Sequence, residues 1–217
     1  MGPIRIRYKT TAMFTCLLVA VLLTVSGPAW TQSTETSPAA LVVKLKTGGY
    51  NFYARHAATD WSQSDKISTY EDLKSCNGTE VRQLSDAGRD QARRLGAALR
   101  KLTIPVARAF ASPYCRTMET ARLMTGLEVE VTDDIMNLRS ARFLGGTDAV
   151  VARARARLSE ATPPSVNVLF VAHGNLGRAA TGQSLAEGEI LVVDPQGNSK
   201  FEIVGRLQLE ALEALSK

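Results

Sequence analysis

Residues 166–172 run Val-Asn-Val-Leu-Phe-Val-Ala, and His173 follows them directly. The stretch is short and almost unbroken in apolar residues. Such a pattern is typical of a strand buried on both faces, because parallel strands in α/β proteins are covered by helices on either side. The stretch therefore predicts a central strand of a parallel sheet, with a histidine just past its carboxyl end.

Shorter strand patterns and helical patterns lie on both sides of this run. The remaining strands are predicted at residues 50–54, 107–111, 129–131, 189–193 and 200–204, the last two around a turn at Pro195–Gly197. Helices are predicted at residues 41–46, 84–101, 113–124, 147–160, 176–181 and 206–215. Residues 60–78 are polar and irregular, which indicates a surface loop. Strands that alternate with helices predict an α/β three-layer sandwich, with a mostly parallel central sheet and helices on both faces.

The N-terminal 29 residues have the organisation of a secretory signal peptide. Arg5, Arg7 and Lys9 form a positive segment, and an apolar run over residues 11–25 follows. Small residues at Gly27–Ala29 then offer a cleavage site. We expect a signal peptide at residues 1–29, a linker at residues 30–40 and one domain at residues 41–217, in a periplasmic or secreted protein. An uncleaved N-terminal anchor is the alternative.

The charge of the chain is explained in part by this N-terminal segment. The chain has 26 basic and 21 acidic residues, and removing Arg5, Arg7 and Lys9 leaves 23 basic residues. The remaining arginines are scattered and are not interleaved with aromatic residues. We therefore expect no nucleic-acid partner, and no membrane association once the signal is cleaved.

Export would also place the chain in an oxidising compartment. The mature chain would keep two cysteines, Cys76 and Cys115. Two cysteines allow one disulfide, which would close a loop of about 40 residues. We expect this disulfide, and two free thiols are the alternative.

Both histidines of the chain, His56 and His173, follow predicted strands. A third predicted strand leads into a Ser-Pro-Tyr-Cys-Arg segment that ends at Arg116. Binding sites in open α/β sheets form outside the carboxyl ends of the strands. If the three strands are neighbours, then Arg55, His56, Arg116 and His173 meet in one crevice.

These residue types suit the transfer of a phosphoryl group. Guanidinium groups match phosphoryl oxygens with paired hydrogen bonds, and a neutral imidazole can attack phosphorus to form a covalent intermediate. A second imidazole can donate hydrogen bonds to the phosphoryl oxygens. The N-terminus of the helix predicted after Pro113 would add backbone N–H donors.

Three segments, in this order, resemble the signatures of the histidine phosphatase superfamily. Residues 53–57 (Tyr-Ala-Arg-His-Ala) resemble its Arg-His-Gly motif, residues 112–121 its Ser-Pro-x-x-Arg block, and residues 171–174 its second-histidine block. The resemblance extends from about residue 41 to the C-terminus. It implies a phosphoglycerate mutase-like fold and a phosphatase without a metal or other cofactor.

The same resemblance implies a role for each matching residue. His56 would be the nucleophile, while Arg55, Arg116 and His173 would bind the phosphoryl oxygens. Arg82, at the polar entry to the helix over residues 84–101, is a further candidate for substrate binding, or alternatively a solvated arginine. The substrate would be a phosphorylated small molecule or a phosphoprotein.

Two positions depart from the pattern of the family. Ala57 replaces the glycine that usually follows the nucleophilic histidine. The usual proton donors are also missing, because Asn137 and Gly174 stand where the two branches of the family carry a carboxyl group. Asp60, Asp134 and Glu189 are candidate substitutes. Without a donor, we expect the enzyme to prefer good leaving groups, such as aryl phosphates or phosphohistidine.

Three other interpretations have weaker support in the sequence. Residues 76–82 satisfy the Cys-x5-Arg spacing of cysteine phosphatases, but no buried strand precedes them. Two distant histidines without a His-Glu-x-x-His motif argue against a metallohydrolase. A catalytically weak module of the same fold that binds phosphate or a phosphoprotein is the main alternative, because the usual acid is missing.

Overall fold

The computed structural model of the chain describes residues 1–2 and 36–217. The predicted signal peptide and most of the predicted linker fall on residues 3–35, outside the described residues. Helix α1 (Pro38–Leu45) begins inside the range predicted as linker. Ser37 caps this helix by accepting a hydrogen bond from the backbone N–H of Ala40, and Pro38 suits its first turn.

Six strands form one mixed sheet in the order β3-β2-β4-β1-β5-β6. Their bounds are β1 Asn51–Arg55, β2 Val106–Ala111, β3 Val129–Val131, β4 Asn167–Ala172, β5 Ile190–Gly197 and β6 Lys200–Leu207. Strands β1 to β4 are parallel, whereas β5 and β6 are antiparallel to their neighbours. Every residue of β4 is buried, and β4 lies between β1 and β2. The predicted central strand is therefore confirmed.

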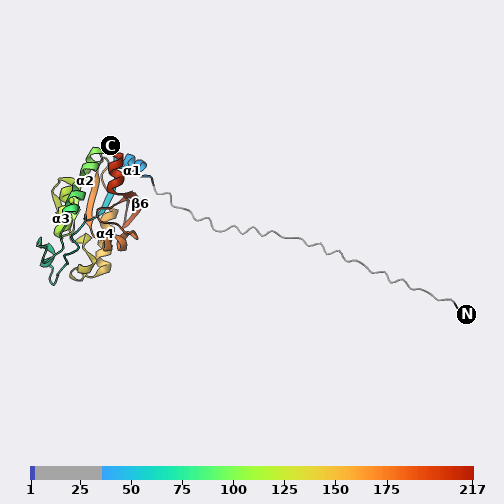
Figure 1. Ribbon diagram of the computed structural model, residues 1–217, viewed down its shortest axis with the longest axis horizontal. Helices are drawn as coiled ribbons and strands as arrows, with labels where there is room; N and C mark the ends of the chain where they lie inside the picture. Colours follow the sequence, from blue (N-terminus) through green and yellow to red (C-terminus); the bar gives the residue numbers. More distant parts are fainter. Residues whose placement is uncertain (3–35) are drawn as a thin grey trace. The chain divides into compact units, whose positions relative to one another are not determined.

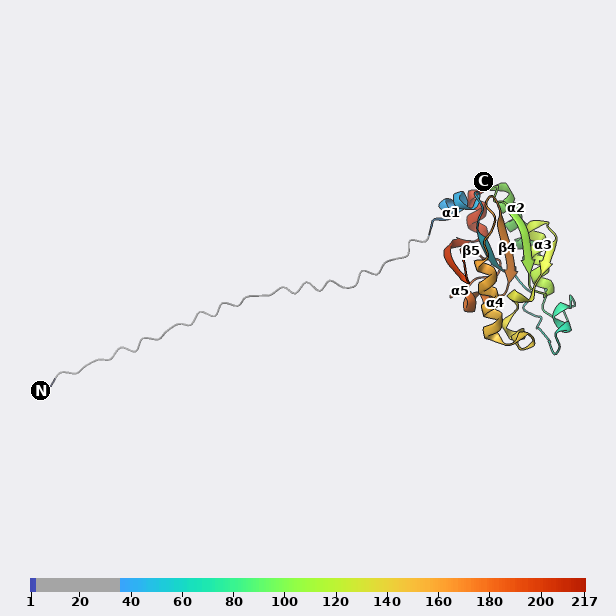
Figure 2. The ribbon, with the colours of Figure 1, turned by 180° about the vertical axis from the view of Figure 1, so that it is seen from behind.

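Helices cover both faces of the sheet (Figures 1 and 2). Leu169 and Val171 of β4 pack in one core with α1, α2, α3 and α6, and Phe170 packs on the opposite face with α4 and α5. Side chains alternate between the two faces because successive residues of a strand point in opposite directions. The other helices are α2 Asp86–Lys101, α3 Cys115–Thr125, α4 Thr147–Ser159, α5 Gly174–Thr181 and α6 Leu209–Leu215. The predicted α/β sandwich is confirmed.

The last hairpin differs from its prediction. Pro195 lies within β5, opposite Phe201, and the turn falls at Asn198 and Ser199. Both turn residues have positive φ angles, 50° and 59°. Tight hairpins require that conformation, and asparagine tolerates it well. Strand β6 continues to Leu207, so helix α6 starts at Leu209 instead of residue 206.

Helix α3 begins at Cys115, two residues later than predicted. Tyr114 keeps an extended backbone, and its carbonyl accepts hydrogen bonds from the backbone N–H groups of Thr117 and Met118. Gly126 ends the helix with a φ of 71°, as its position in the sequence indicated.

A long segment, residues 57–85, connects β1 to α2; we call it the β1–α2 loop. It contains a short 3-10 helix, η1 (Glu71–Lys74). The predicted disulfide is present: Cys76 of this loop is bonded to Cys115, the first residue of α3. Two further 3-10 helices that the sequence pattern did not reveal, η2 (Asp133–Ile135) and η3 (Leu138–Leu144), follow β3.

Within the described residues, no helix has the length and apolar character needed to cross a membrane.

Candidate active site

Three parallel strands deliver the candidate residues to one edge of the sheet. Arg55 is the last residue of β1 and His56 follows it, while His173 follows β4. Strand β2 ends at Ala111 and leads through Ser112 into α3, which carries Arg116. The rings of His56 and His173 lie with their centroids 5.6 Å apart. The structure thus brings together the residues that the sequence placed in one crevice.

His56 is buried and held as one tautomer. Its Nδ1 lies 2.9 Å from the carbonyl oxygen of Ala57, which can only accept a hydrogen bond, so Nδ1 carries the proton. Its backbone N–H donates to the carbonyl of Ala172 and ties the residue to β4. Burial lowers the pKa of His56 to about 3, with the positive charge of Arg116 as the next cause. The imidazole is therefore neutral near pH 7, with Nε2 available as a nucleophile.

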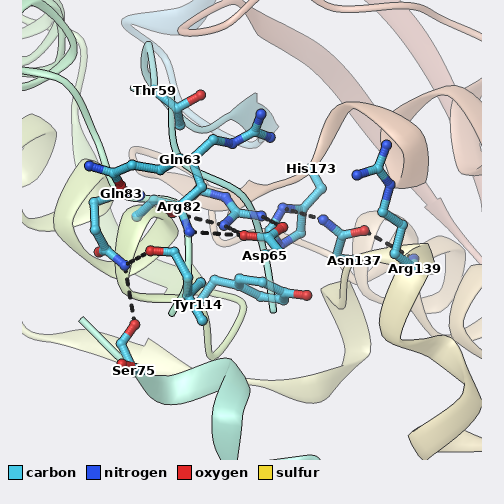
Figure 3. A network of polar contacts seen from close by, with 12 residues as sticks. Thr59, Gln63, Asp65, Ser75, Arg82, Gln83, Tyr114, Asn137, Arg139 and His173 are labelled. Atoms are coloured by element: carbon cyan, nitrogen blue, oxygen red, sulfur yellow. Dashed lines mark hydrogen bonds and ion pairs between the residues drawn. The ribbon is translucent and has the colours of Figure 1, made fainter. Parts of the chain in front are cut away.

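His173 is positioned by hydrogen bonds on both ring nitrogens. Its Nδ1 lies 3.2 Å from the side-chain nitrogen of Asn137, and its Nε2 lies 2.7 Å from the hydroxyl of Ser112. The orientation of the Asn137 amide is set because its oxygen accepts bonds from the backbone of Arg139 and from Asn175. Asn137 therefore donates to Nδ1 (Figure 3), and Nε2 donates to Ser112. Burial lowers the pKa of His173 well below its usual value, so this ring is also neutral.

Backbone contacts hold both histidine segments in place. The hydroxyl of Tyr53 on β1 donates a 2.7 Å hydrogen bond to the carbonyl of His173. The ring of Tyr53 packs closely against α5 at Gly177, where a Cβ would lie 2.8 Å from the ring. Thr120 of α3 accepts a hydrogen bond from the backbone N–H of Ala57. The position of each histidine is thus fixed by its neighbouring elements.

Three arginines, Arg55, Arg82 and Arg116, surround the histidines with unused donors. Arg55 contacts the carbonyl of Leu185 and the carboxylate of Glu187. The guanidinium of Arg82 lies over the ring of Trp61, with its carbon 4.0 Å from the ring centroid. The Nε atom of each arginine is buried and has no hydrogen-bond partner, and no other buried side-chain nitrogen or oxygen in the described residues lacks one. Orphaned buried donors are rare in native proteins, and the positive charges of all three arginines act on His56.

Asp65 of the β1–α2 loop covers the guanidinium of Arg116. The two carboxylate oxygens accept hydrogen bonds of 2.9 and 3.1 Å from the two terminal nitrogens of Arg116. One of the oxygens also accepts the backbone N–H of Arg82. The side chain of Arg116 is 1% exposed and that of Asp65 is 11% exposed. Figure 3 shows Asp65 beside His173 and Arg82 in the centre of this polar network.

A cavity of about 210 Å³ lies in front of these residues. It is lined by Arg55, His56, Trp61, Asp65, Arg82, Asn137, Arg139, His173, Gly174 and Asn175. Arg116 does not line the cavity, because Asp65 lies over it. Gly174 leaves space for Arg55, since a Cβ at this position would lie 3.1 Å from the Arg55 side chain.

The three carboxylates that we named as candidate proton donors do not line this cavity. Asp60 bonds to Ser62 and Gln63 of its own loop, and Asp134 pairs with Arg157. Glu189 accepts the backbone N–H of Ala186 and faces Arg206. Each of the three carboxylates is therefore paired with groups outside the cavity.

The disulfide excludes the cysteine-phosphatase interpretation. Cys76 is bonded to Cys115, so it cannot supply a thiolate. Arg82, the arginine of that motif, lines the cavity beside the histidines instead. Within the described residues, no group of three or more His, Cys, Asp or Glu side chains is arranged to hold a metal ion.

Sequence reasoning missed several residues of the site. Trp61 and Asp65 come from the polar loop, and Arg139 and Asn175 follow Asn137 and Gly174 by one or two positions. Their neighbours in the sequence could have suggested Arg139 and Asn175. Nothing in the pattern of the loop distinguishes Asp65 from the other carboxylates.

The fold and the site together define an α/β domain with an arginine-lined cavity and two buried, neutral histidines at the ends of parallel strands. Residues 52–162, about half of the chain, match the family model for branch 1 of the histidine phosphatase superfamily. The chain therefore belongs to the histidine phosphatase superfamily.

Solved structures of similar fold agree with this assignment. The protein histidine phosphatase SixA, complexed with tungstate, superposes with a TM-score of 0.53 at 17% identity, covering 75% of this chain and 99% of SixA. A phosphoserine phosphatase from Entamoeba histolytica, in complex with 3-phosphoglyceric acid, has a TM-score of 0.50 at 15% identity and covers 75% of this chain and 98% of its own. At this identity the likeness shows the fold. Among proteins with curated descriptions, none matches this chain.

Proposed function

We propose that this protein is a phosphatase that cleaves a phosphomonoester or a phosphoramidate through a phosphohistidine on His56. One observation carries the proposal: Arg55, Arg82 and Arg116, each with a buried and unpartnered Nε donor, place their positive charges around a neutral His56. A phosphoryl group has the oxygens that these donors lack, and it has the electrophilic phosphorus that a neutral imidazole can attack.

The proposed reaction begins when the phosphoryl group enters the cavity. Arg55 and Arg82 hold its oxygens, and Arg116 joins them once Asp65 gives way. The Ala57 carbonyl keeps the proton on Nδ1 of His56, so the lone pair of Nε2 attacks phosphorus and the leaving group departs. Charge neutralisation by the arginines lets the reaction proceed without a metal ion.

His173 would contribute a hydrogen bond from the side of the cavity. Its Nδ1 lies on the cavity side, since its partner Asn137 lines the cavity and Ser112 does not. Asn137 donates to this Nδ1 in the structure, so the bound anion would have to take the place of the Asn137 amide, and the ring proton would have to move from Nε2 to Nδ1. The neutral ring must then accept a hydrogen bond at Nε2. The hydroxyl of Ser112 can supply it, because a hydroxyl can donate as well as accept.

The substrate class follows from the neighbours as well as from the charge of the site. SixA is named a protein histidine phosphatase, and the Entamoeba histolytica enzyme is named for phosphoserine. We propose that this chain acts on a phosphorylated small molecule or a phosphoprotein. We also propose export to the periplasm or the medium, with a signal peptide at residues 1–29 and the phosphatase domain at residues 41–217. The disulfide supports an oxidising compartment.

Turnover of a panel of phosphomonoesters and phosphohistidine by the purified protein tests this function, alongside binding of vanadate to the same sample. We expect both turnover and binding. Vanadate binding without turnover of any substrate would instead support the alternative, a phosphate- or phosphoprotein-binding module. Neither binding nor turnover would contradict both functions.

A further inference from the structure

Asp65 is the one carboxylate among the residues that line the cavity in the described part of the chain. The other polar side chains on the wall are arginines, histidines and the amides of Asn137 and Asn175. Neither amide can give a proton to an alkoxide near pH 7. If the proposed phosphatase has a proton donor in its cavity wall, this loop aspartate is the side chain with the right chemistry.

The contact between Asp65 and Arg116 uses the same donors that a phosphoryl group needs. Both terminal nitrogens of Arg116 face the two oxygens of Asp65, and the side chain of Arg116 is otherwise covered. A phosphoryl group offers a similar pair of oxygens with more negative charge. Substrate binding at Arg116 therefore exchanges one anion for another and releases the carboxylate into the cavity.

The released carboxylate would lie beside the anion that displaced it. Negative charge close to a carboxylate favours its protonated form, and the bound anion has taken the place of Asp65 on Arg116. Arg82 and Arg139 also line this part of the cavity and oppose the effect, while a bound phosphoryl group offsets their charge. Substrate binding thus prepares Asp65 to take up a proton from solvent, to which its side chain is partly open.

The position of Asp65 in the fold also suits a donor to the leaving group. His56 and His173 rise from the ends of strands β1 and β4, whereas Asp65 belongs to the loop that extends beyond that end of the sheet (Figures 1 and 2). In-line displacement puts the leaving oxygen on the side of phosphorus opposite the attacking Nε2 of His56. Asp65 thus reaches the cavity from the loop and not from the strand ends that carry the nucleophile.

We propose that Asp65 is a catalytic residue, the proton donor to the leaving group; this inference rests on the proposed phosphatase function. In the first step Nε2 of His56 forms a bond to phosphorus, the bond from phosphorus to the leaving oxygen breaks, and the proton of Asp65 moves to that oxygen. The products are the free alcohol, the Asp65 carboxylate and a phosphorylated, positively charged imidazole.

The second step restores the enzyme. The Asp65 carboxylate accepts a proton from water, the water oxygen bonds to phosphorus, and the bond from phosphorus to Nε2 breaks with its electron pair returning to the ring. The products are inorganic phosphate, neutral His56 and protonated Asp65. The wild-type enzyme then does not depend steeply on the leaving group, in contrast to the preference for good leaving groups expected from Asn137 and Gly174.

The test compares two leaving groups in the full protein and its Asp65→Asn variant. p-Nitrophenyl phosphate leaves without assistance, and glycerol 2-phosphate needs a proton. In a single turnover, we expect Asp65→Asn to slow the release of glycerol from glycerol 2-phosphate about 100-fold or more, and the release of p-nitrophenol less than tenfold. The matched control is Asp60→Asn, a carboxylate of the same loop that does not line the cavity, and we expect it to keep both rates.

Three results would overturn the proposal. Equal loss on both substrates would make Asp65 a support for Arg116 only. Faster turnover of both, with tighter vanadate binding, would make it a mere competitor for Arg116. Unchanged rates would remove it from the reaction. Formation of a phosphoenzyme from p-nitrophenyl phosphate in Asp65→Asn separates these outcomes from failure of the proposed function, which would leave the wild type without a phosphoenzyme.

Discussion

The site is built from two regions with different construction, the strand ends and the β1–α2 loop. His56, His173 and Ser112 are buried at the ends of parallel strands, where the sheet fixes their backbone. Nδ1 of His56 and both ring nitrogens of His173 have defined hydrogen-bond partners. The loop is mostly exposed or half-buried, and hydrogen bonds with a disulfide hold it in place. Trp61 on this loop is 66% exposed, in contrast to His56 at 3%.

This difference suggests that the strand ends and the loop have separate roles in one cavity. The rigid strand ends suit a nucleophile and phosphoryl ligands, which must be held within a fraction of an ångström. The loop carries Asp65, whose contact with Arg116 must break when an anion binds. Changes at the strand ends should therefore affect every substrate, whereas changes in the loop should affect substrates selectively or act on stability.

Removal of the nucleophile should give the largest effect. His56→Ala should lower kcat/KM by about 10⁴-fold or more for every substrate, since the covalent route is lost. Vanadate binding, measured by calorimetry, should remain detectable because Arg55 and Arg82 are intact. Comparison of the melting temperatures checks that the variant is folded. Turnover near the wild-type rate would exclude His56 as the nucleophile.

Loss of the disulfide should act on the loop and on stability. The bond closes a separation of 39 residues, for which the chain-entropy model gives about 4 kcal/mol. A Cys76→Ser, Cys115→Ser double variant should unfold at a lower urea concentration, with a free energy of unfolding that is smaller by this amount. Hydrogen exchange should quicken in residues 57–85 before it does in β1 and β4. Equal loss of protection in both regions would remove the distinction between them.

A change of pH should reveal the buried histidine. The pKa of His56 is lowered by burial and by Arg116 to about 3 in the folded protein, while the unfolded chain takes up this proton near pH 6.5. Between these values the unfolded state binds more protons, so the free energy of unfolding falls as the pH falls. One such histidine lowers the free energy of unfolding by about 2 kcal/mol between pH 7 and pH 5.

The variant His56→Gln isolates this contribution. The wild type should lose about 2 kcal/mol more than the variant between pH 7 and pH 5, in urea unfolding at each pH. The carboxylates titrate in both proteins and cancel in the comparison. Parallel stability curves would mean that His56 takes up its proton at the same pH in the folded and the unfolded chain, so that its pKa is not lowered by folding.

The smallest effect on activity and binding is expected from Ser112, the partner of Nε2 of His173. Ser112→Ala removes the hydroxyl at Nε2 and leaves a buried ring nitrogen without its partner. Vanadate should bind about tenfold more weakly, because one lost buried hydrogen bond costs about 1–3 kcal/mol. Ser159→Ala, a buried serine at the end of α4, serves as the control and should keep the affinity. Tighter binding in Ser112→Ala would contradict the proposal that Ser112 donates to Nε2 when an anion is bound.

The strand ends could be predicted from sequence for a physical reason. A strand covered on both faces is apolar at nearly every position, so residues 166–172 revealed β4 and the place of His173. Arg55, His56 and Arg116 then followed from their positions at the other strand ends. Gly126 marked the end of α3 because few other residues adopt its positive φ without strain.

The loop could not be predicted in this way. Five carboxylates occur in residues 57–85, and no periodic pattern separates them. Which of them meets Arg116 depends on the path of the loop, which local contacts and the bond to Cys115 determine together. The turn at Asn198 was missed for a related reason, since Pro195 and Gly197 were the stronger local signals although Pro195 is tolerated near the end of β5.

Trapping of the covalent intermediate tests the central claim most directly. The wild type is mixed with p-nitrophenyl phosphate, quenched in base during turnover, digested and mapped by mass spectrometry. We predict a phosphate on His56 that survives base and is lost in acid, present in Asp65→Asn and absent in His56→Ala. Active turnover without any phosphorylated residue, or with the phosphate on a side chain other than His56, would contradict the account.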